Sequence, residues 1–216
     1  MYTPVNFVMK ILPYSLWIAY DVKNHNDLQK LLPPNTKLSN VKIFDDELVT
    51  TPKLLFNSYS VDSSFMKGKR CEVLTVAESR KGKHFVILDC LTNTLDWNPF
   101  DGIKIANSNN DILYSRISKE LKHRVVSGKR KLFVKGTSGT HKKISKSFVV
   151  EPNKNCFYRD VPLNFYMTFD IDQVSKNVVK LTDMTLENGF WENFRGKMTH
   201  CFYHEQEMTY TVTVKE

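Results

Sequence analysis

The sequence predicts a mainly β (β-rich α+β) protein, a single-domain antiparallel β-barrel with few short helices. The clearest strand signals are the segments 165–171 and 208–214, in which apolar residues alternate with polar ones. Such period-two alternation buries one face of a sheet and exposes the other, so both are expected to be central antiparallel strands. The residues expected on their buried faces are Phe165, Met167, Phe169, Tyr210 and Val212.

Shorter segments rich in apolar, β-branched or aromatic residues, separated by turn residues, predict the other strands. Segment 11–20 is also expected to be a buried strand, because Pro13 and the direct run into Asp21 do not fit a signal peptide. Many strands with few helices favour a closed or nearly closed barrel, or a sandwich. The shorter expected strands are 41–44, 71–77, 84–91, 131–135, 147–150 and 178–186.

Two helices are expected. The first is a short helix at 26–32, capped by Asn26 or Asp27 and ended by the prolines at 33–34. The second is expected at 111–125.

Composition places the chain among packed globular proteins, with 41% hydrophobic and 12% aromatic residues in 216 positions. One domain, 1–216, is expected, because no linker or change in composition divides the chain. No apolar run reaches the roughly 18 residues that a membrane helix needs, so no membrane partner is expected. The four cysteines form no CxxC pair, which favours reduced thiols and a cytoplasmic location.

A basic stretch occupies 116–146, where eleven Lys or Arg residues occur with one acid, Glu120. Its charge of +10 exceeds the net +8 of the whole chain. The stretch is either a surface for nucleic acid or another polyanion, or a solvated hairpin that maintains solubility. We favour the hairpin, because no aromatic residue is interleaved before Phe133 to stack on bases.

Recognised cofactor and metal motifs are missing from the sequence. There is no Gly-rich phosphate loop, Walker motif or nucleophile elbow, so no cofactor is expected. His200 and His204 flank Cys201, but on a strand two residues four apart lie about 13 Å from each other, too far to share one ion. We therefore predict no metal site.

Lys104 is the candidate nucleophile, because it lies between Ile103 and Ile105. Burial would disfavour its ammonium form and lower its pKa, leaving an amine that attacks carbonyls to form a Schiff base. The alternative is a strand lysine that points to solvent between two core isoleucines.

The segment 14–38 (YSLWIAYDVKNHNDLQKLLPPNTKL) resembles the opening of acetoacetate decarboxylase-like proteins. A looser similarity continues through 68–72, the strand 84–91 and 101–104, about half of the chain in all. The resemblance implies a conical, largely antiparallel barrel around an apolar cavity. It also implies Schiff-base lyase chemistry, with Lys104 near the nucleophile's place and Glu72 near that of an active-site carboxylate.

The sequence departs from the family's active-site phrase, Gly-x-Pro-Lys-Lys preceded by Gly-Arg-Glu. Gly102-Ile103-Lys104-Ile105 has no proline and no second lysine, which removes one means of lowering the pKa of the nucleophile. The leading hypothesis is a barrel that binds a small carbonyl-bearing or apolar molecule, with catalytic residues Lys104 and Glu72. The alternatives are a non-catalytic binding barrel and a polyanion binder acting through 116–146; homo-oligomerisation is left open.

Overall fold

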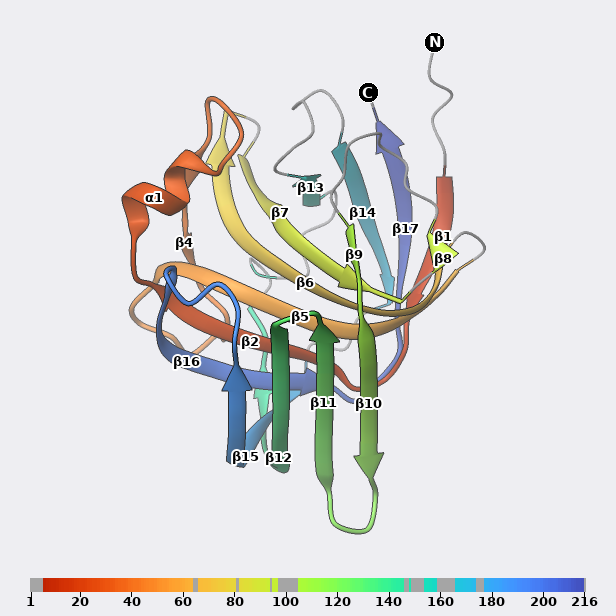
Figure 1. The fold of residues 1–216 in the computed structure, drawn as a ribbon. Coiled ribbons are helices and arrows are strands. Elements are labelled where there is room, and N and C mark those ends of the chain that lie inside the picture. The colour runs from red at the N-terminus through yellow and green to blue at the C-terminus, as the bar shows by residue number, and fades with distance from the viewer. Residues whose placement is uncertain are drawn as a thin grey trace.

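The computed structural model describes residues 6–63, 66–80, 82–93, 95–96, 105–145, 148, 154–158, 166–173 and 177–215 (Figure 1). The elements in chain order are β1 (Asn6–Ile11), β2 (Ser15–Val22), α1 (His25–Lys30), β3 (Lys37–Leu38), β4 (Asn40–Val41), β5 (Thr51–Ser63), β6 (Met66–Ser79), β7 (Gly82–Thr92), β8 (Leu95–Asp96), β9 (Ile105–Asn107), β10 (Asn109–Ser115), β11 (Glu120–Ser127), β12 (Arg130–Lys143), β13 (Lys154–Tyr158), β14 (Tyr166–Gln173), β15 (Asn177–Asn188), β16 (Arg195–His204) and β17 (Met208–Lys215). α1 is the one helix in this part of the chain, and it is too short to cross a membrane.

Seven strands pair in a closed ring. Starting from β5, the ring runs through β6, β7, β13, β14, β17 and β1, and β1 pairs back with β5. All these pairings are antiparallel except that of β7 with β13. The predicted antiparallel β-barrel is therefore confirmed, with one parallel pairing in its wall.

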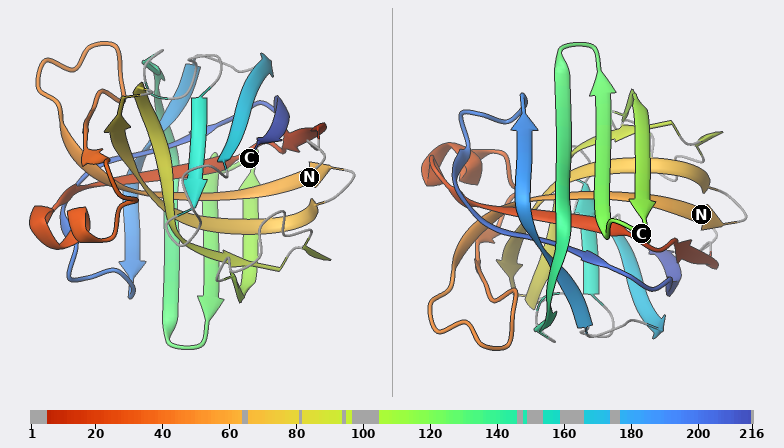
Figure 2. Two further views of the ribbon diagram at one scale, coloured as in Figure 1. Left: turned by 90° about the horizontal axis from the view of Figure 1, so that it is seen from above. Right: turned by 90° about the horizontal axis from the view of Figure 1, so that it is seen from below.

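The same sheet extends beyond this ring and folds back over it. The N-terminal part of β5 pairs with β2, and the sheet then continues through β16, β15, β12, β11 and β10. Figure 2 shows β10–β12 crossing over β2 and β5 at a steep angle. Sheets that cross in this way pack their inward-facing side chains into a common core.

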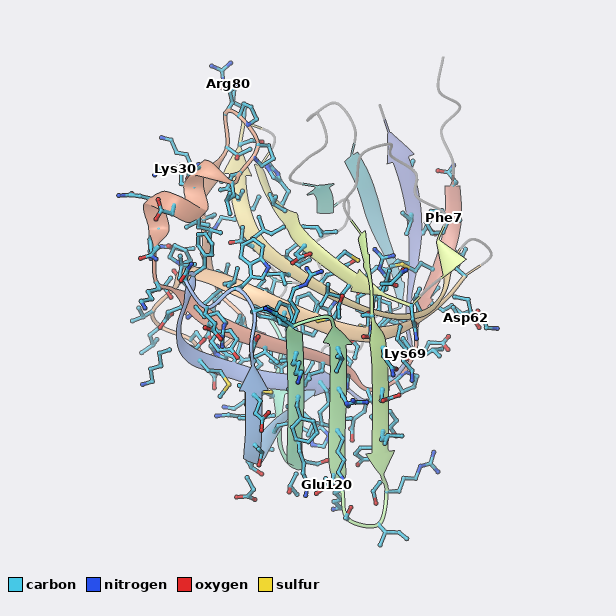
Figure 3. All side chains as sticks on the ribbon, in the orientation of Figure 1. Phe7, Lys30, Asp62, Lys69, Arg80 and Glu120 are labelled. Carbon is cyan, nitrogen blue, oxygen red and sulfur yellow. The ribbon has the colours of Figure 1, made fainter. Side chains whose placement is uncertain are left out.

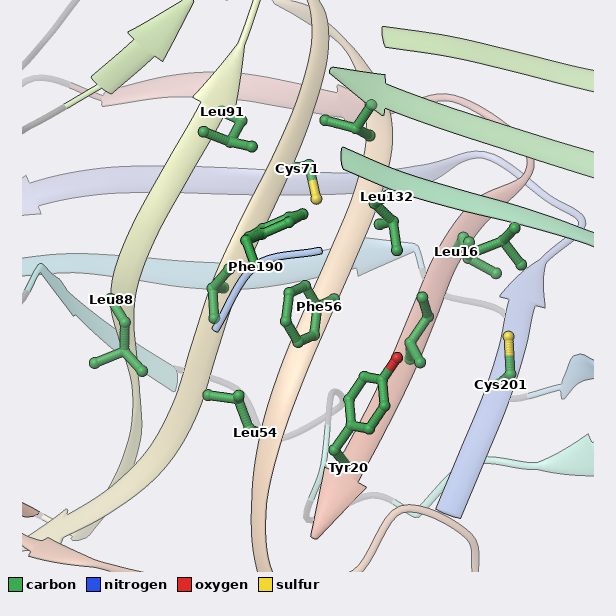
Figure 4. Close-up of a cluster of buried hydrophobic side chains, with 14 of the residues drawn as sticks. Leu16, Tyr20, Leu54, Phe56, Cys71, Leu88, Leu91, Leu132, Phe190 and Cys201 are labelled. Atoms are coloured by element: carbon green, nitrogen blue, oxygen red, sulfur yellow. The ribbon is translucent and has the colours of Figure 1, made fainter. Parts of the chain in front are cut away.

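The strand β5 therefore has a buried residue at every position from Lys53 to Tyr59, and again at Val61. Leu55, Tyr59 and Val61 belong to an inner cluster inside the ring. Leu54 and Phe56 belong to an outer cluster, which also contains Leu16, Leu132 and Phe190 (Figure 4). Because alternate side chains of a strand point to opposite faces, one strand serves both clusters. Such strands appear as continuous apolar runs rather than as alternating ones.

Several sequence-based strand predictions are confirmed. The segment 11–20 contributes Ile11 to β1 and most of β2, which is buried along nearly its whole length. In β17, Met208, Tyr210 and Val212 are buried, as the alternation predicts. The segment 165–171 is strand β14 from Tyr166 onward. Phe165 and, apart from Phe148, the expected strand 147–150 lie outside the described residues.

The short helix predicted at 26–32 is confirmed as α1, but the predicted capping residue, Asn26 or Asp27, is wrong. Asn24 occupies the N-cap of α1 and makes no side-chain capping bond. Instead, its amide donates a hydrogen bond of 2.5 Å to the carbonyl of Asn193, and so ties the helix to the loop before β16.

The helix predicted at 111–125 is wrong, because this segment forms the β10–β11 hairpin. The residues that it buries completely are Leu121, His123 and Val125, which recur with the period of a strand. Lys119 supplies the left-handed turn residue, with φ of 51°.

A glycine permits the close approach of β12 to β15. A Cβ atom on Gly139 would lie 2.7 Å from Thr182 Cγ2 and 2.8 Å from the carbonyl oxygen of Lys180. The strands shift register beside this position, between Ser138 and His141.

Gly139→Ala is therefore expected to lower the free energy of unfolding by about 1–3 kcal/mol, because the added methyl group overlaps backbone. Urea unfolding measures the change. Gly189→Ala is the control, since its Cβ would approach nothing closer than 3.7 Å. An equal effect of the two substitutions would contradict the close approach.

Candidate functional site

Four residues form a row across neighbouring strands on the inner face of the barrel wall. Trp17 of β2 lies opposite Asn57 of β5, Asn57 opposite Glu72 of β6, and Glu72 opposite Cys90 of β7. Opposite residues share a face, and their Cβ atoms lie about 4.5–5.5 Å apart. Since Trp17 belongs to the inner cluster, all four side chains face the interior of the barrel. We call these four residues the inner row.

A buried ion pair lies at the centre of this row. Arg70 and Glu72 are two residues apart on β6 and therefore share its inner face. Arg70 Nε donates to Glu72 Oε1 at 3.2 Å, and the side chains are only 4% and 9% exposed. Removing two charges from water costs desolvation free energy even when they are paired, so burying this pair reduces the stability that the interior contributes.

Beside the ion pair lies a group of polar side chains with incomplete hydrogen bonding. Ser15 donates to Asn57 Oδ1 at 3.2 Å. His204 lies opposite Ser15 in the β2–β16 pairing, and burial lowers its pKa to about 4, which keeps the imidazole neutral. Three buried nitrogens have no hydrogen-bond partner among the described residues. They are the two ring nitrogens of His204 and the indole nitrogen of Trp17.

A second polar group lies at the other end of the inner face. Lys53 Nζ contacts Asp21 Oδ1 at 2.7 Å, and its side chain is 8% exposed. His200 pairs with Glu47 on the loop between β4 and β5. His200 therefore has a carboxylate partner while His204 has none. No three potential metal ligands gather anywhere in the described part of the chain.

Of the two predicted catalytic residues, Glu72 and Lys104, the structure describes only Glu72. Glu72 lies on the inner face as described above. Lys104 lies outside the described residues. The strand that begins with the next residue, β9, pairs in parallel with β7 and brings Ile105 opposite Cys90.

Six of the ten basic residues that the structure describes in the stretch form ion pairs with acids, most of which lie outside the stretch. Lys122 and Lys135 share Glu120, which lies near the free end of the β10–β11 hairpin (Figure 3). Four further basic residues pair with aspartates outside the stretch: Arg124 with Asp111, Arg130 with Asp89, Lys142 with Asp46 and Lys143 with Asp45.

Four exposed basic residues of the stretch make no ion pair within the described chain: Arg116, Lys119, Lys129 and Lys131. Two of them lie at each end of β11, whose 8 residues separate the pairs by about 25 Å. Because the two pairs are a strand length apart, they do not form one continuous basic surface, which favours the solvated-hairpin interpretation.

His123, within the same stretch, is a structural residue of the outer layer. Its Nε2 is 3.0 Å from the carbonyl oxygen of Tyr14, so this nitrogen carries the proton. Nδ1 then accepts from the Ser58 hydroxyl at 3.0 Å. Burial lowers the pKa of His123 to about 3, and the neutral ring ties β11 to β5 and to Tyr14, whose φ is 72°.

The family resemblance indicates Glu72 as a site residue, and this role remains a prediction. The other inner-face residues, Trp17, Asn57, Arg70 and His204, are not indicated by the sequence. The available signal was a single polar residue inside a long apolar strand, as in Leu55-Phe56-Asn57. Only the pairing register, which joins four distant segments, shows that these residues face one another.

No protein-family model and no curated protein matches the sequence. Solved structures do match it over nearly its full length. An acetoacetate decarboxylase from Legionella pneumophila superposes with a TM-score of 0.61 at 12% identity, covering 100% of this chain and 89% of that chain. The enduracididine biosynthesis enzyme MppR complexed with pyruvate gives 0.59 at 10%, covering 99% and 90%. An acetoacetate decarboxylase-like enzyme from Sphingomonas wittichii gives 0.60 at 7%, covering 98% and 91%.

The chain has the acetoacetate decarboxylase-like fold. The fold expected from the opening segment 14–38 is thereby confirmed. At these identities the likeness establishes the fold of the acetoacetate decarboxylase-like proteins and leaves the chemistry to the residues of the inner face.

The Arg70–Glu72 pair in this acetoacetate decarboxylase-like barrel gives a stability prediction. Glu72→Leu should lower the free energy of unfolding by about 3–5 kcal/mol, because it leaves the guanidinium buried without its carboxylate. The double variant Arg70→Met/Glu72→Leu should recover most of this loss, since two apolar side chains replace both charges. Urea unfolding of the two variants is the measurement. A double variant no more stable than Glu72→Leu would show that the pair does not act as a unit.

Proposed function

We propose that this protein binds a small carbonyl-bearing molecule inside its acetoacetate decarboxylase-like barrel and forms a Schiff base with it through Lys104. The observation that carries the proposal is the buried Arg70–Glu72 pair, with Asn57 beside it, on the inner face of the barrel. Burying charges costs free energy of folding, and such groups cluster at functional sites more often than elsewhere.

Two similar structures support a carbonyl ligand. The Legionella protein is an acetoacetate decarboxylase, and MppR was solved with pyruvate. Acetoacetate and pyruvate are both small keto acids. The same class of molecule is the natural first choice for this chain.

The proposed chemistry begins with an unprotonated amine. The Lys104 amine adds to the ligand carbonyl, and loss of water gives a protonated imine. If the ligand is a β-keto acid, the electrons of its carbon–carboxylate bond move toward the imine, which releases carbon dioxide and leaves an enamine. Protonation of the enamine carbon and addition of water then release the ketone and free the amine.

The register brings the strand that follows Lys104 close to Glu72. Ile105 lies opposite Cys90, which in turn lies opposite Glu72. Two strand spacings separate Ile105 from Glu72, which corresponds to about 10 Å between their Cα atoms. A contact between Glu72 and the Lys104 amine is part of the proposal, because Lys104 lies outside the described residues.

Arg70 resolves an electrostatic conflict in the proposed site. A carboxylate alone would raise the pKa of a nearby lysine and keep it protonated. Arg70, 3.2 Å from Glu72, offsets that negative charge. We propose that this guanidinium takes the part of the second lysine that the family phrase has and that Gly102-Ile103-Lys104-Ile105 lacks.

Borohydride reduction in the presence of acetoacetate or acetone should trap a covalent adduct on Lys104. The site is located by peptide mass spectrometry, and Lys104→Ala should abolish the adduct. Lys53→Met is the matched control, because Lys53 is a second lysine of the inner face but is held in an ion pair with Asp21. Its removal should leave the adduct unchanged.

The outcomes separate two functions. Ligand binding without an adduct on Lys104 would indicate a non-catalytic binding barrel. Failure of every keto acid and ketone to bind would overturn the proposal as a whole.

A further inference from the structure

On the inner face, two buried side chains have nitrogens without a hydrogen-bond partner among the residues that the structure describes. They are Trp17, through its indole nitrogen, and His204, through both ring nitrogens. His204 is fully buried and Trp17 is 6% exposed. Buried polar groups are nearly always paired, because an unpaired one loses its hydration without compensation. Two such residues side by side are therefore candidates for binding a polar group of a ligand.

The two residues are neighbours across the β2–β16 pairing. Trp17 lies opposite Phe202, and Ser15 lies opposite His204. Trp17 and His204 are thus diagonal neighbours on one face, with Cα atoms about 7–8 Å apart. The rings of Phe202 and His204 lie 6.5 Å apart, which places the imidazole beside the inner cluster.

A nearby partner for His204 is already engaged. The Ser15 hydroxyl lies directly opposite His204 but donates to Asn57 instead. Asn57, which accepts this bond through Oδ1, lies opposite Trp17. Trp17 and His204 therefore leave unused hydrogen-bonding groups beside Asn57, on three adjacent strands. We call these three residues the polar pole.

The chemistry of the polar pole selects a type of ligand group. An indole only donates, whereas a neutral imidazole donates through one nitrogen and accepts through the other. The pole itself carries no charge, and Glu72 of the inner row is paired with Arg70. A carboxylate or an ammonium would find no counter-charge there. A hydroxyl group accepts and donates at once, as this set requires.

We propose that the polar pole binds a hydroxyl group, and hence that the ligand of this barrel is a hydroxyl-bearing carbonyl compound. The hydroxyl accepts from the Trp17 indole and donates to the bare nitrogen of His204, with Asn57 as a further donor. The proposal rests on the proposed function, because it assigns one end of the ligand that the inner row would hold. Along the inner row, the carbonyl end would lie toward Glu72.

The test compares ketones that differ only in a terminal hydroxyl. Hydroxyacetone, 4-hydroxybutan-2-one and 5-hydroxypentan-2-one are titrated against acetone, butanone and pentan-2-one, with binding followed by ligand-observed NMR. The Lys104→Ala protein is used, so that no imine forms and the hydroxyl contribution is measured alone. At least one hydroxyketone should bind about tenfold or more tightly than its deoxy partner, because the site's polar groups stay unpaired in the deoxy complex.

His204→Phe should remove this preference and leave the affinity for the simple ketones largely unchanged. Phe202→Leu is the matched control, because it alters packing on the same face of β16 without touching a polar group, and it should retain the preference. His204→Phe should also raise Tm by roughly 2–4 °C, since it removes unpaired polar atoms from the core.

A measurement on the unsubstituted chain covers the case in which His204→Phe fails to fold. In protein with ¹⁵N-labelled histidine, the hydroxyketone should shift the bare-nitrogen resonance of His204, and the deoxy ketone should not. Equal binding of hydroxyketones and ketones, or a preference that survives His204→Phe, would overturn the inference. A hydroxyl preference in Lys104→Ala together with no borohydride adduct in the unsubstituted chain would uphold the polar pole and reject the Schiff-base chemistry.

Discussion

The structure depends on the central strands β5 and β6, which bury side chains on both faces. One face builds the interior of the closed seven-strand ring, and the other builds the core shared with β10–β12. Because successive side chains point to opposite faces, a shift of one residue would exchange the two cores. The register of β5 with β6 therefore fixes Asn57 opposite Glu72, and with it the composition of the inner row.

The inner face contains a neutralised ion pair and, beside it, buried polar groups without hydrogen-bond partners among the described residues. Arg70 and Glu72 neutralise each other in a setting where a lone charge would be very costly. Beside them, Trp17 and His204 keep buried nitrogens without partners. His123 of the outer core differs from His204, because it uses both of its nitrogens within the fold. Two buried histidines of one chain thus differ, because His123 has two partners within the fold and His204 has none among the described residues.

The sequence predicts correctly those strands that bury one face only and those elements whose ends are marked by proline. The alternation of 208–214 and the prolines after α1 are local signals, and both predictions are confirmed. The hairpin at 109–127 was mistaken for a helix because His123 interrupts the apolar alternation of Leu121 and Val125, and only its bonds to Ser58 and Tyr14 explain its burial. For the site, a resemblance indicated Glu72, whereas Arg70, Asn57 and His204 required the register of strands far apart in the sequence. Such pairings are set by tertiary structure and leave no local pattern.

A crystal structure of the protein soaked with a small ketone and reduced with borohydride tests the central claim most directly. The account predicts electron density for the ligand inside the ring, in contact with the Arg70–Glu72 pair or Asn57 and continuous with the Lys104 amine. A barrel interior filled entirely by side chains, with ligand only on the outer surface, would contradict it.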